Sequence, residues 1–440
     1  MNGKVRTEKR YEGGERLKMS KGKYLLIGAI LLVAVLALPA ISACAPGAAP
    51  PPKEKVVTYL SLADYTGPIA GLNVPADLAA DDMFKEINAK GGIDGVKVNF
   101  IGVDTRYDTA RGVSAYKRYR TEPKLVLVYA ISTAVAKAIR PMNMKDKVVQ
   151  FVTGDGEAQA FIGSAFAIGP VYQNAFGATI DFILEDWKIK GNPGVPTIGY
   201  MSWDNAYGRE PLRGGQEYAE KLGVKLLPPE FFPTGAPDHT VWLRRLAEGG
   251  AQYIIVGGVD PTPSNILRDA YRMGLTKTIQ FVDATFWGPD EAVGIKLHPE
   301  ATEGCWVNSF YPRGDEAWLH PLAAYIVPKY RGKSVEEFRK GTAAIYVTGL
   351  SRGLNFQAAV ARALKDVGYE KLDGEAVKRG YESLTGVDIS QGLLEPCTYS
   401  PTSRQGNDVV KFYQVQKGKA VDISGWVKVP DTVALYDWSK

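Results

Sequence analysis

Short β-branched runs alternate with helical patterns along most of this 440-residue chain, and this alternation limits the fold more than any other feature. Several runs are apolar on both faces, as parallel strands buried between two layers of helices are. The expected strands cover residues 56–62, 96–103, 125–129, 148–152, 197–201, 253–257, 279–282 and 305–310. The helical patterns between them cover residues 74–89, 171–187, 209–222, 241–247 and 264–273. This order predicts an α/β fold with open, mostly parallel sheets.

The number of strands predicts two such sheets. About nine strands precede a mainly helical region at residues 316–384, and a last strand is expected at residues 409–416. Open α/β sheets bind ligands at the carboxyl ends of their strands, so the loops that follow the strands are the expected site. These loops cover residues 63–73, 130–133, 153–157, 202–208, 259–264 and 283–288.

The formal charge of +5 is concentrated before residue 44. Eight of the 53 Lys and Arg residues and three of the 48 Asp and Glu residues lie there, which leaves 45 of each sign in the rest of the chain. A protein that binds a phosphate backbone electrostatically needs a surplus of Lys and Arg on its folded surface. The neutral body therefore argues against nucleic acid as a partner.

Motifs for cofactors, metals and catalysis are sparse. Three cysteines are too few for a disulfide scaffold, and three histidines leave little for metal or general-base chemistry. No GxGxxG follows the first strand, and the chain has no complete phosphate loop, HExxH or CxxC. We therefore expect no cofactor, no metal site and no catalytic residue, and we do not expect an enzyme.

The first 43 residues have the order of a secretory signal peptide. Lys21 and Lys23 precede an uncharged apolar run at residues 24–43. The run ends in Ile41-Ser42-Ala43-Cys44, which resembles a bacterial lipobox, in which the cysteine becomes the lipidated first residue of the mature chain. The alternative is a retained transmembrane anchor, although the run is short for a spanning helix and contains a proline.

Residues 44–55, which are rich in Pro and Ala, are typical of a flexible-to-extended tether. Met19 is a better start than Met1 because it places the two lysines directly before the apolar run, so residues 1–18 could be untranslated. The leader, Cys44 and the tether together predict an extracytoplasmic protein that is anchored to the cell membrane by a lipid.

Four motifs in a fixed order carry a family resemblance. Residues 84–98 read FKEINAKGGIDGVKV, Thr66-Gly67-Pro68 follows the first strand, residues 204–208 read DNAYG, and residues 267–275 read LRDAYRMGL. Over about residues 56–429 the chain resembles the type I solute-binding proteins of ABC transporters, in the branched-chain amino acid and amide class. The resemblance implies two Rossmann-like lobes, three crossovers between them, and a ligand trapped as the lobes close.

By analogy with this family, lobe 1 is expected at residues 56–172 plus 309–390, and lobe 2 at residues 173–308 plus 391–440. The resemblance also implies a small-molecule ligand, ABC permease subunits with cytoplasmic ATPases as partners, and a monomer. The expected ligand is a branched-chain amino acid, an amide or a related small carboxylate.

Binding residues transfer from the family position by position. Ser132 falls where the family has a serine that receives the ligand carboxylate together with backbone N–H groups, and Ile131 and Thr133 flank it. A plain N-cap serine is the alternative. Tyr207 matches a tyrosine that closes the pocket, with a packed aromatic as the alternative. Leu72 aligns with a side chain over the ligand's tail, although it could equally anchor a loop.

Two positions differ from the family pattern, and they leave the identity of the ligand undetermined. Gly154-Asp155-Gly156 places Gly156 where the family usually has threonine, and Thr285 stands where an acidic residue normally meets the α-ammonium. A buried ammonium needs a charged partner or aromatic faces. Asp155, Asp260 or Asp283 could supply the charge and Trp287 the face, or the ligand could lack an ammonium. The alternative for these aspartates is turn stabilisation.

Two further questions stay open in the sequence. Cys305 and Cys397 could form a disulfide or remain two buried thiols. The transport role competes with a ligand sensor of the same fold and, more remotely, with an extracytoplasmic enzyme that uses Asp155 and Asp283 as a carboxylate pair.

Overall fold

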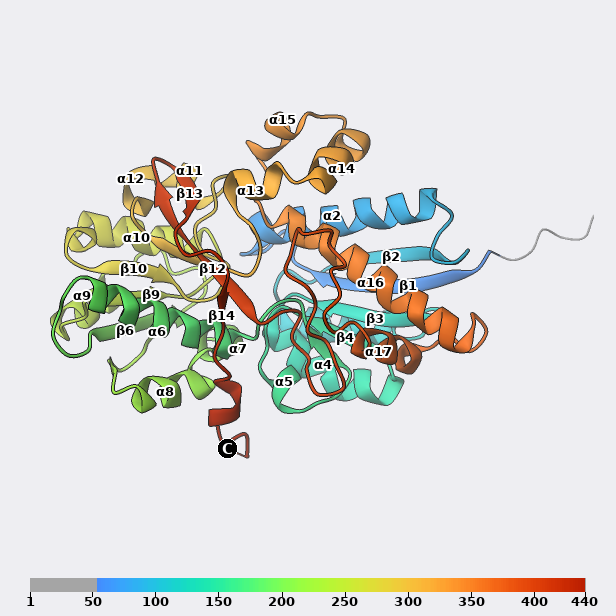
Figure 1. Ribbon diagram of the computed structural model, residues 1–440, viewed down its shortest axis with the longest axis horizontal. Helices are drawn as coiled ribbons and strands as arrows, with labels where there is room; N and C mark the ends of the chain where they lie inside the picture. The colour runs from blue at the N-terminus through green and yellow to red at the C-terminus, as the bar shows by residue number, and fades with distance from the viewer. Residues whose placement is uncertain (1–53, 440) are drawn as a thin grey trace, which may run out of the picture. The chain divides into compact units, whose positions relative to one another are not determined.

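The computed structural model describes residues 54–439 (Figure 1). The expected signal peptide, the lipidation residue Cys44 and nearly all of the tether lie outside these residues. Between residues 54 and 439, no helix combines the length and the apolar character that a membrane crossing requires.

The first lobe contains a five-stranded sheet in which all strands run parallel. The strand order is β2-β1-β3-β4-β5. The strands are β1 (Val56–Ala63), β2 (Lys97–Asp104), β3 (Leu125–Ala130), β4 (Val149–Val152) and β5 (Ala165–Ala167). All residues of β3 and β4 are buried, as expected for central parallel strands that are covered on both faces.

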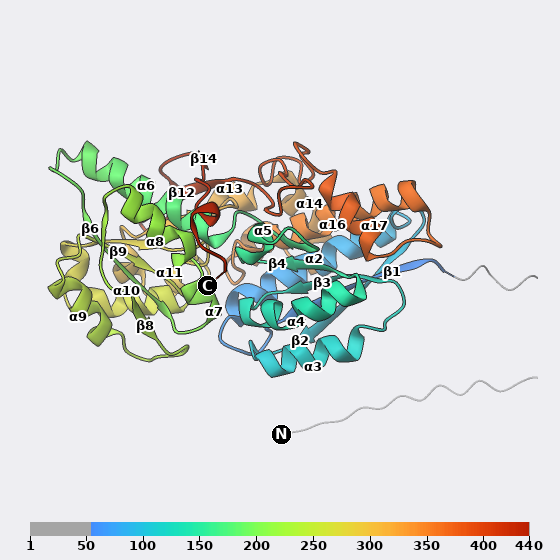
Figure 2. The ribbon, with the colours of Figure 1, turned by 90° about the horizontal axis from the view of Figure 1, so that it is seen from below.

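Helices cover both faces of this sheet (Figure 2). They are α2 (Ala70–Ala89), α3 (Thr109–Tyr119), α4 (Thr133–Asp146), α5 (Glu157–Ala160), α16 (Tyr346–Val367) and α17 (Gly374–Glu382). Helices α2 and α16 pack against each other over Tyr59 of β1, whose ring centroid lies 5.1 Å from that of Phe84 and 5.2 Å from that of Phe356. On the opposite face, α3 and α4 bury Tyr116, Val135 and other side chains.

The second lobe contains a mixed sheet of nine strands. Its main order is β13-β12-β11-β10-β9-β6-β7, with β8 beside β6 and β14 beside β12. The strands are β6 (Thr197–Trp203), β7 (Lys225–Leu226), β8 (Glu230–Phe232), β9 (Tyr253–Val256), β10 (Gln280–Asp283), β11 (Trp306–Ser309), β12 (Val409–Gln416), β13 (Lys419–Asp422) and β14 (Val427–Lys428). Strands β6 to β11 run parallel, whereas β12 is antiparallel to β11, β13 and β14. The sheet is therefore less uniformly parallel than the sequence suggested.

The remaining helices flank the second sheet and link the lobes. They are α6 (Tyr172–Ile189), α7 (Ala206–Arg209), α8 (Leu212–Lys221), α9 (Thr240–Glu248), α10 (Thr262–Arg272), η2 (Leu275–Lys277), α11 (Gly294–Leu297), α12 (Pro299–Thr302), α13 (Gly314–Trp318), α14 (Pro321–Arg331), α15 (Val335–Arg339) and η3 (Val433–Leu435). The chain crosses from one lobe to the other after β5, after β11 and before β12, which gives the three crossovers expected of the fold.

The expected boundary of the second lobe at residue 391 is corrected by the contacts of the segment before β12. The Tyr399 hydroxyl donates to the Ala167 carbonyl at 2.8 Å, and the Arg404 Nε donates to the Gly163 carbonyl at 2.8 Å. Both acceptors belong to the first lobe, so residues 391–407 pack there. Near the C-terminus, Val433 is buried in the first lobe's core, while η3 also packs against α8.

Candidate ligand-binding site

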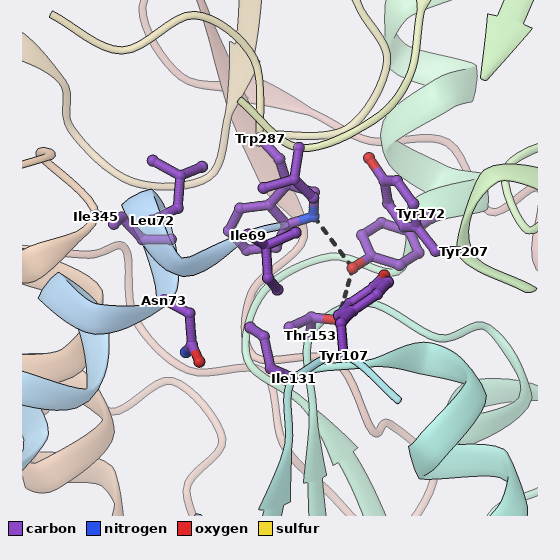
Figure 3. Close-up of a pocket in the computed structure, with 11 residues that line it drawn as sticks. Ile69, Leu72, Asn73, Tyr107, Ile131, Thr153, Tyr172, Tyr207, Trp287 and Ile345 are labelled. Carbon is purple, nitrogen blue, oxygen red and sulfur yellow. Dashed lines mark hydrogen bonds between the residues drawn. The ribbon is translucent and has the colours of Figure 1, made fainter. Parts of the chain in front are cut away.

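A cavity of about 350 Å³ lies at the carboxyl ends of the strands of both sheets. The lining residues are Ile69, Leu72, Asn73, Tyr107, Ile131, Thr153, Tyr172, Tyr207, Val259, Trp287 and Ile345 (Figure 3). Each of the six loops that the sequence pointed to contributes at least one of them, and both lobes form the wall.

The lining is aromatic and aliphatic, and no lining side chain carries a formal charge at neutral pH. Burial raises the pKa of the lining phenols Tyr107, Tyr172 and Tyr207 above the ordinary value, so they remain neutral. A ligand in this cavity therefore has a largely apolar environment in which a few hydrogen-bonding groups set its orientation.

A chain of hydrogen bonds joins the two lobes through the cavity wall (Figure 3). The Trp287 indole Nε1–H, from the loop after β10, donates to the Tyr172 hydroxyl at 3.1 Å. The Tyr172 hydroxyl in turn donates to Thr153 Oγ1, after β4, at 2.6 Å. Trp287 was a predicted site residue, whereas Tyr172 and Thr153 were not named from the sequence.

Tyr207 lines the cavity from α7, where the family resemblance expected it. Its hydroxyl donates to the Gly258 carbonyl at 2.9 Å and lies 2.7 Å from Thr285 Oγ1. Its ring makes an edge contact with that of Tyr172 at 5.2 Å. Thr285 therefore holds the Tyr207 hydroxyl and does not itself line the cavity, which differs from the direct role expected for it.

Asn73 is a cavity residue that the sequence did not reveal. It lies in the first turn of α2, and its Oδ1 accepts a hydrogen bond from the Asp64 backbone N–H. Because a backbone N–H can only donate, this bond fixes the orientation of the amide. The Asn73 Nδ2 is buried and has no hydrogen-bond partner among the described residues. Leu72, the preceding residue, lines the cavity as expected.

Ser132 is the N-cap of α4, and its Oγ accepts from the Val135 N–H at 3.4 Å. The N-cap interpretation therefore describes its local contact. Neither Ser132 nor Thr133 lines the cavity, whereas Ile131 does. The Thr133 Oγ1 is buried without a partner among the described residues. A role for this helix start in binding a carboxylate stays a prediction.

The structure does not bring the Gly154-Asp155-Gly156 loop into the cavity lining. A Cβ on Gly154 would lie 2.7 Å from the ring of Tyr172, so this glycine makes room for a residue that does line the cavity. Gly156 likewise makes room for Gln173. The Asp155 carboxylate is fully buried and pairs with Arg140, which satisfies its charge. Asp155 does not line the cavity, and its contact with a ligand stays a prediction.

Asp260 and Asp283 are buried behind the cavity wall. Asp260 accepts from Ser264 Oγ at 2.6 Å and from the Gly294 N–H at 2.7 Å, which is a loop-stabilising role. Burial, the largest cause, raises the pKa of Asp260 to about 7 and that of Asp283 to about 7. Neither residue lines the cavity, and a ligand contact by either stays a prediction.

Cys305 and Cys397 are free, buried cysteines. The Cys305 Sγ contacts the Trp306 carbonyl at 3.4 Å, and the Cys397 Sγ contacts Asn355 Oδ1 at 3.2 Å. The disulfide alternative was therefore wrong. Among residues 54–439, no cluster of three or more His, Cys, Asp or Glu side chains is placed to hold a metal ion.

Four predicted residues meet at the cavity, namely Leu72, Ile131, Tyr207 and Trp287. The sequence missed Ile69, Asn73, Tyr107, Thr153, Tyr172, Val259 and Ile345. Four of these residues lie in loops that the sequence analysis expected at the site, so their position in the chain could have identified them: Ile69, Asn73, Thr153 and Val259. Ile345 comes from the helical region before α16, and no local pattern marks it.

A fully parallel lobe and a mixed lobe, joined by three crossovers around a cavity, define a type I periplasmic binding protein fold. A periplasmic binding protein family model matches residues 61–420. The chain is 24% identical over 252 residues to the Leu/Ile/Val/Thr-binding protein of Salmonella typhimurium; the match covers 55% of this chain and 65% of that protein, just under two thirds of its length.

Solved structures agree on the fold. A branched-chain amino acid ABC transporter protein from Thermus thermophilus, with bound valine, has a TM-score of 0.75 at 18% identity, covering 87% of this chain and 98% of that one. A solute-binding protein from Rhodopseudomonas palustris HaA2, in complex with p-hydroxybenzoic acid, has a TM-score of 0.70 at 14% identity, covering 87% and 99%. The chain belongs to the periplasmic binding protein family, in the class of substrate-binding proteins that resemble those of branched-chain amino acid transporters.

Proposed function

We propose that this protein is an extracytoplasmic, lipid-anchored solute-binding protein that captures a small metabolite between its lobes and delivers it to an ABC permease. The observation that carries the proposal is the cavity at residues such as Ile131, Tyr172 and Trp287, which is walled by both lobes. A ligand held by both lobes stabilises the closed form, and a closed form is a signal that a permease can recognise.

The relatives guide the choice of ligands. The Salmonella protein is named for Leu, Ile, Val and Thr, one structural neighbour holds valine and another holds p-hydroxybenzoic acid. The ligand of this chain is accordingly a branched-chain amino acid, an amide or a related small carboxylate.

Thermal unfolding in the presence of a metabolite panel tests the binding function. A ligand that binds only the folded state stabilises it by about 2.7 kcal/mol at 100 times its Kd, which is measurable as a rise in Tm. We expect at least one amino acid, amide or small carboxylate to raise the Tm saturably, without being chemically changed. If no compound of a broad panel does so, the solute-binding proposal fails.

The membrane anchor is tested separately. Cys44 carries the lipid, so labelled palmitate is incorporated into the wild-type precursor and not into a Cys44→Ala variant. The variant is also found in the soluble extracytoplasmic fraction, where we expect a monomer by size-exclusion chromatography. Palmitate label in the Cys44→Ala protein would contradict the lipobox assignment.

The sensor alternative shares the cavity and differs in the partner. It predicts that the closed protein binds a signalling protein and does not stimulate a permease ATPase, which a reconstituted ATPase measurement decides. The enzyme alternative relied on Asp155 and Asp283. Asp155 pairs with Arg140 and neither aspartate lines the cavity, so this pair is not available to a ligand there.

A further inference from the structure

Three of the polar cavity side chains, Asn73, Thr153 and Tyr172, already accept a hydrogen bond from the protein. Asn73 Oδ1 accepts from the Asp64 N–H, and Thr153 Oγ1 accepts from Tyr172. The Tyr172 hydroxyl itself accepts from Trp287. An ammonium group has only donors to offer, and no side chain in this set carries the negative charge that would pair with it.

Donors, in contrast, remain. The Asn73 Nδ2 lies on a cavity residue, is buried and has no partner among the described residues. Thr153 accepts from Tyr172 and so keeps its own O–H to donate. Helix α4 begins at Thr133, two residues after the lining residue Ile131, and the N–H groups of a helix start favour an anion. This set of groups is complementary to a carboxylate.

The carboxylates in the loops around the cavity already form hydrogen bonds or ion pairs with other groups of the protein. Both oxygens of Asp64 accept backbone bonds, from Gly67 at 2.5 Å and from Ile69 at 3.0 Å. Asp155 pairs with Arg140, and Asp260 accepts three protein hydrogen bonds. Among residues 54–439 no carboxylate lines the cavity, so an ammonium there would meet aromatic faces but no counter-charge, which leaves much of its desolvation uncompensated.

We propose that the ligand is a small monocarboxylate with an apolar, branched or aromatic body and no amino group. The proposal rests on the cavity being the ligand site, as proposed above. Asn73 and Thr153 donate to the carboxylate, and the body lies among Leu72, Ile131, Tyr207 and Trp287. The specificity-determining features are the unpaired amide of Asn73 and the absence of an acidic residue from the lining.

Matched ligand pairs test this chemistry directly. 4-Methylpentanoate is leucine without its amino group, and 3-phenylpropanoate is phenylalanine without its amino group. Isothermal titration of the whole protein should give at least one carboxylate that binds about tenfold or more tighter than its amino acid, because the ammonium lacks a partner. If leucine or phenylalanine binds more tightly than its partner acid, the inference is wrong and the solute-binding function stands.

An isosteric substitution tests the role of Asn73. Asn73→Asp keeps the acceptor for the Asp64 N–H and replaces the free amide with a negative charge. We expect the carboxylate affinity to fall about tenfold or more. Unchanged carboxylate affinity in a variant of normal Tm overturns the assignment. If instead neither ligand pair binds and another compound of the panel does, the substrate class is wrong; if nothing binds, the proposed function fails with it.

Discussion

The Lys137 ammonium, on α4 of the first lobe, lies 2.8 Å from the Glu210 carboxylate that follows α7 in the second lobe. Lys137 also contacts Glu157 at 2.7 Å, and Arg213 of the second lobe reaches Glu157 at 3.5 Å. These pairs connect the lobes on the side of α4. Because Glu210 is buried, its charge depends on this cross-lobe partner.

Removing Lys137 should therefore loosen the closed form. In Lys137→Met, Glu210 and Glu157 lose a shared cation, and a buried carboxylate without its partner is destabilised by about 3–5 kcal/mol unless it takes up a proton. We expect a lower Tm and weaker ligand binding. The control is Lys117→Met on α3, because Lys117 is exposed. Equal Tm values for the two variants would contradict a cross-lobe role.

Asp283 makes stability depend on pH. Burial raises the pKa of its carboxyl from 3.8 to about 7, with nearby Arg313 acting in the opposite direction. The folded state thus keeps a proton that the unfolded chain releases, so this group's stabilisation is complete below pH 4 and is lost as pH rises through 7. From pH 4 to 8, the wild type should lose about 1–4 kcal/mol relative to Asp283→Asn. Chemical denaturation across that pH range measures the free energy of unfolding of both proteins. A difference between them that does not change with pH would contradict the prediction.

Trp287 should report ligand binding by its fluorescence. It lines the cavity and donates to Tyr172, so Trp287→Phe loses one hydrogen bond, worth about 0.5–1.5 kcal/mol, and the indole that senses the ligand. We expect a several-fold weaker affinity and most of the fluorescence change abolished. Trp187→Phe, at the far end of α6, should keep both. If Trp287→Phe keeps the full fluorescence change on ligand binding, another tryptophan is responsible for that change.

The two buried thiols should resist modification. Burial raises the pKa of Cys397 to about 12 and that of Cys305 well above the ordinary value, so neither forms a reactive thiolate near neutral pH. Iodoacetamide should label neither in the folded protein and both in guanidinium without reductant. Mass spectrometry of the digested protein checks this, and a linked Cys305–Cys397 peptide pair would contradict it.

Gly349 should be essential to the packing of α16 on α2. A Cβ at this position would come within 1.9 Å of the Ala76 carbonyl oxygen, which is backbone and cannot move aside cheaply. Gly349→Ala should destabilise the protein by about 1–3 kcal/mol. Gly341→Ala is the matched control, because no atom lies within 4 Å of its added Cβ. Similar free energies of unfolding for both variants would show that the helices can separate.

The long strands were predictable because β-branched, doubly buried runs such as 125–129 have few other interpretations. Strands β7 and β14, of two residues each, are too short to carry a pattern and form only because a sheet edge is available. Of helix α4 only the start at Ser132 and Thr133 was predicted; the helix contains Pro141 and a polar last turn, and tertiary contacts decide its length.

The site was predictable at the level of loops and not of side chains. Strand ends fix where a cavity forms, whereas the partners of each residue depend on segments that are distant in sequence. Asp155 is an example, because its partner Arg140 lies on helix α4, whose extent was not predicted. Thr285 is another, since only the structure shows that its hydroxyl meets Tyr207.

The contact of Tyr59 with Phe356 has a consequence for how the molecule is made. Helix α16, which covers one face of the first sheet, lies far downstream of β1 in the chain. A polypeptide that emerges from its N-terminus therefore completes all five strands of that sheet while one apolar face is covered by α2 without α16. Such an intermediate is prone to aggregate. The first lobe cannot mature until the second has been synthesised, so the cell must protect a half-covered sheet throughout that interval.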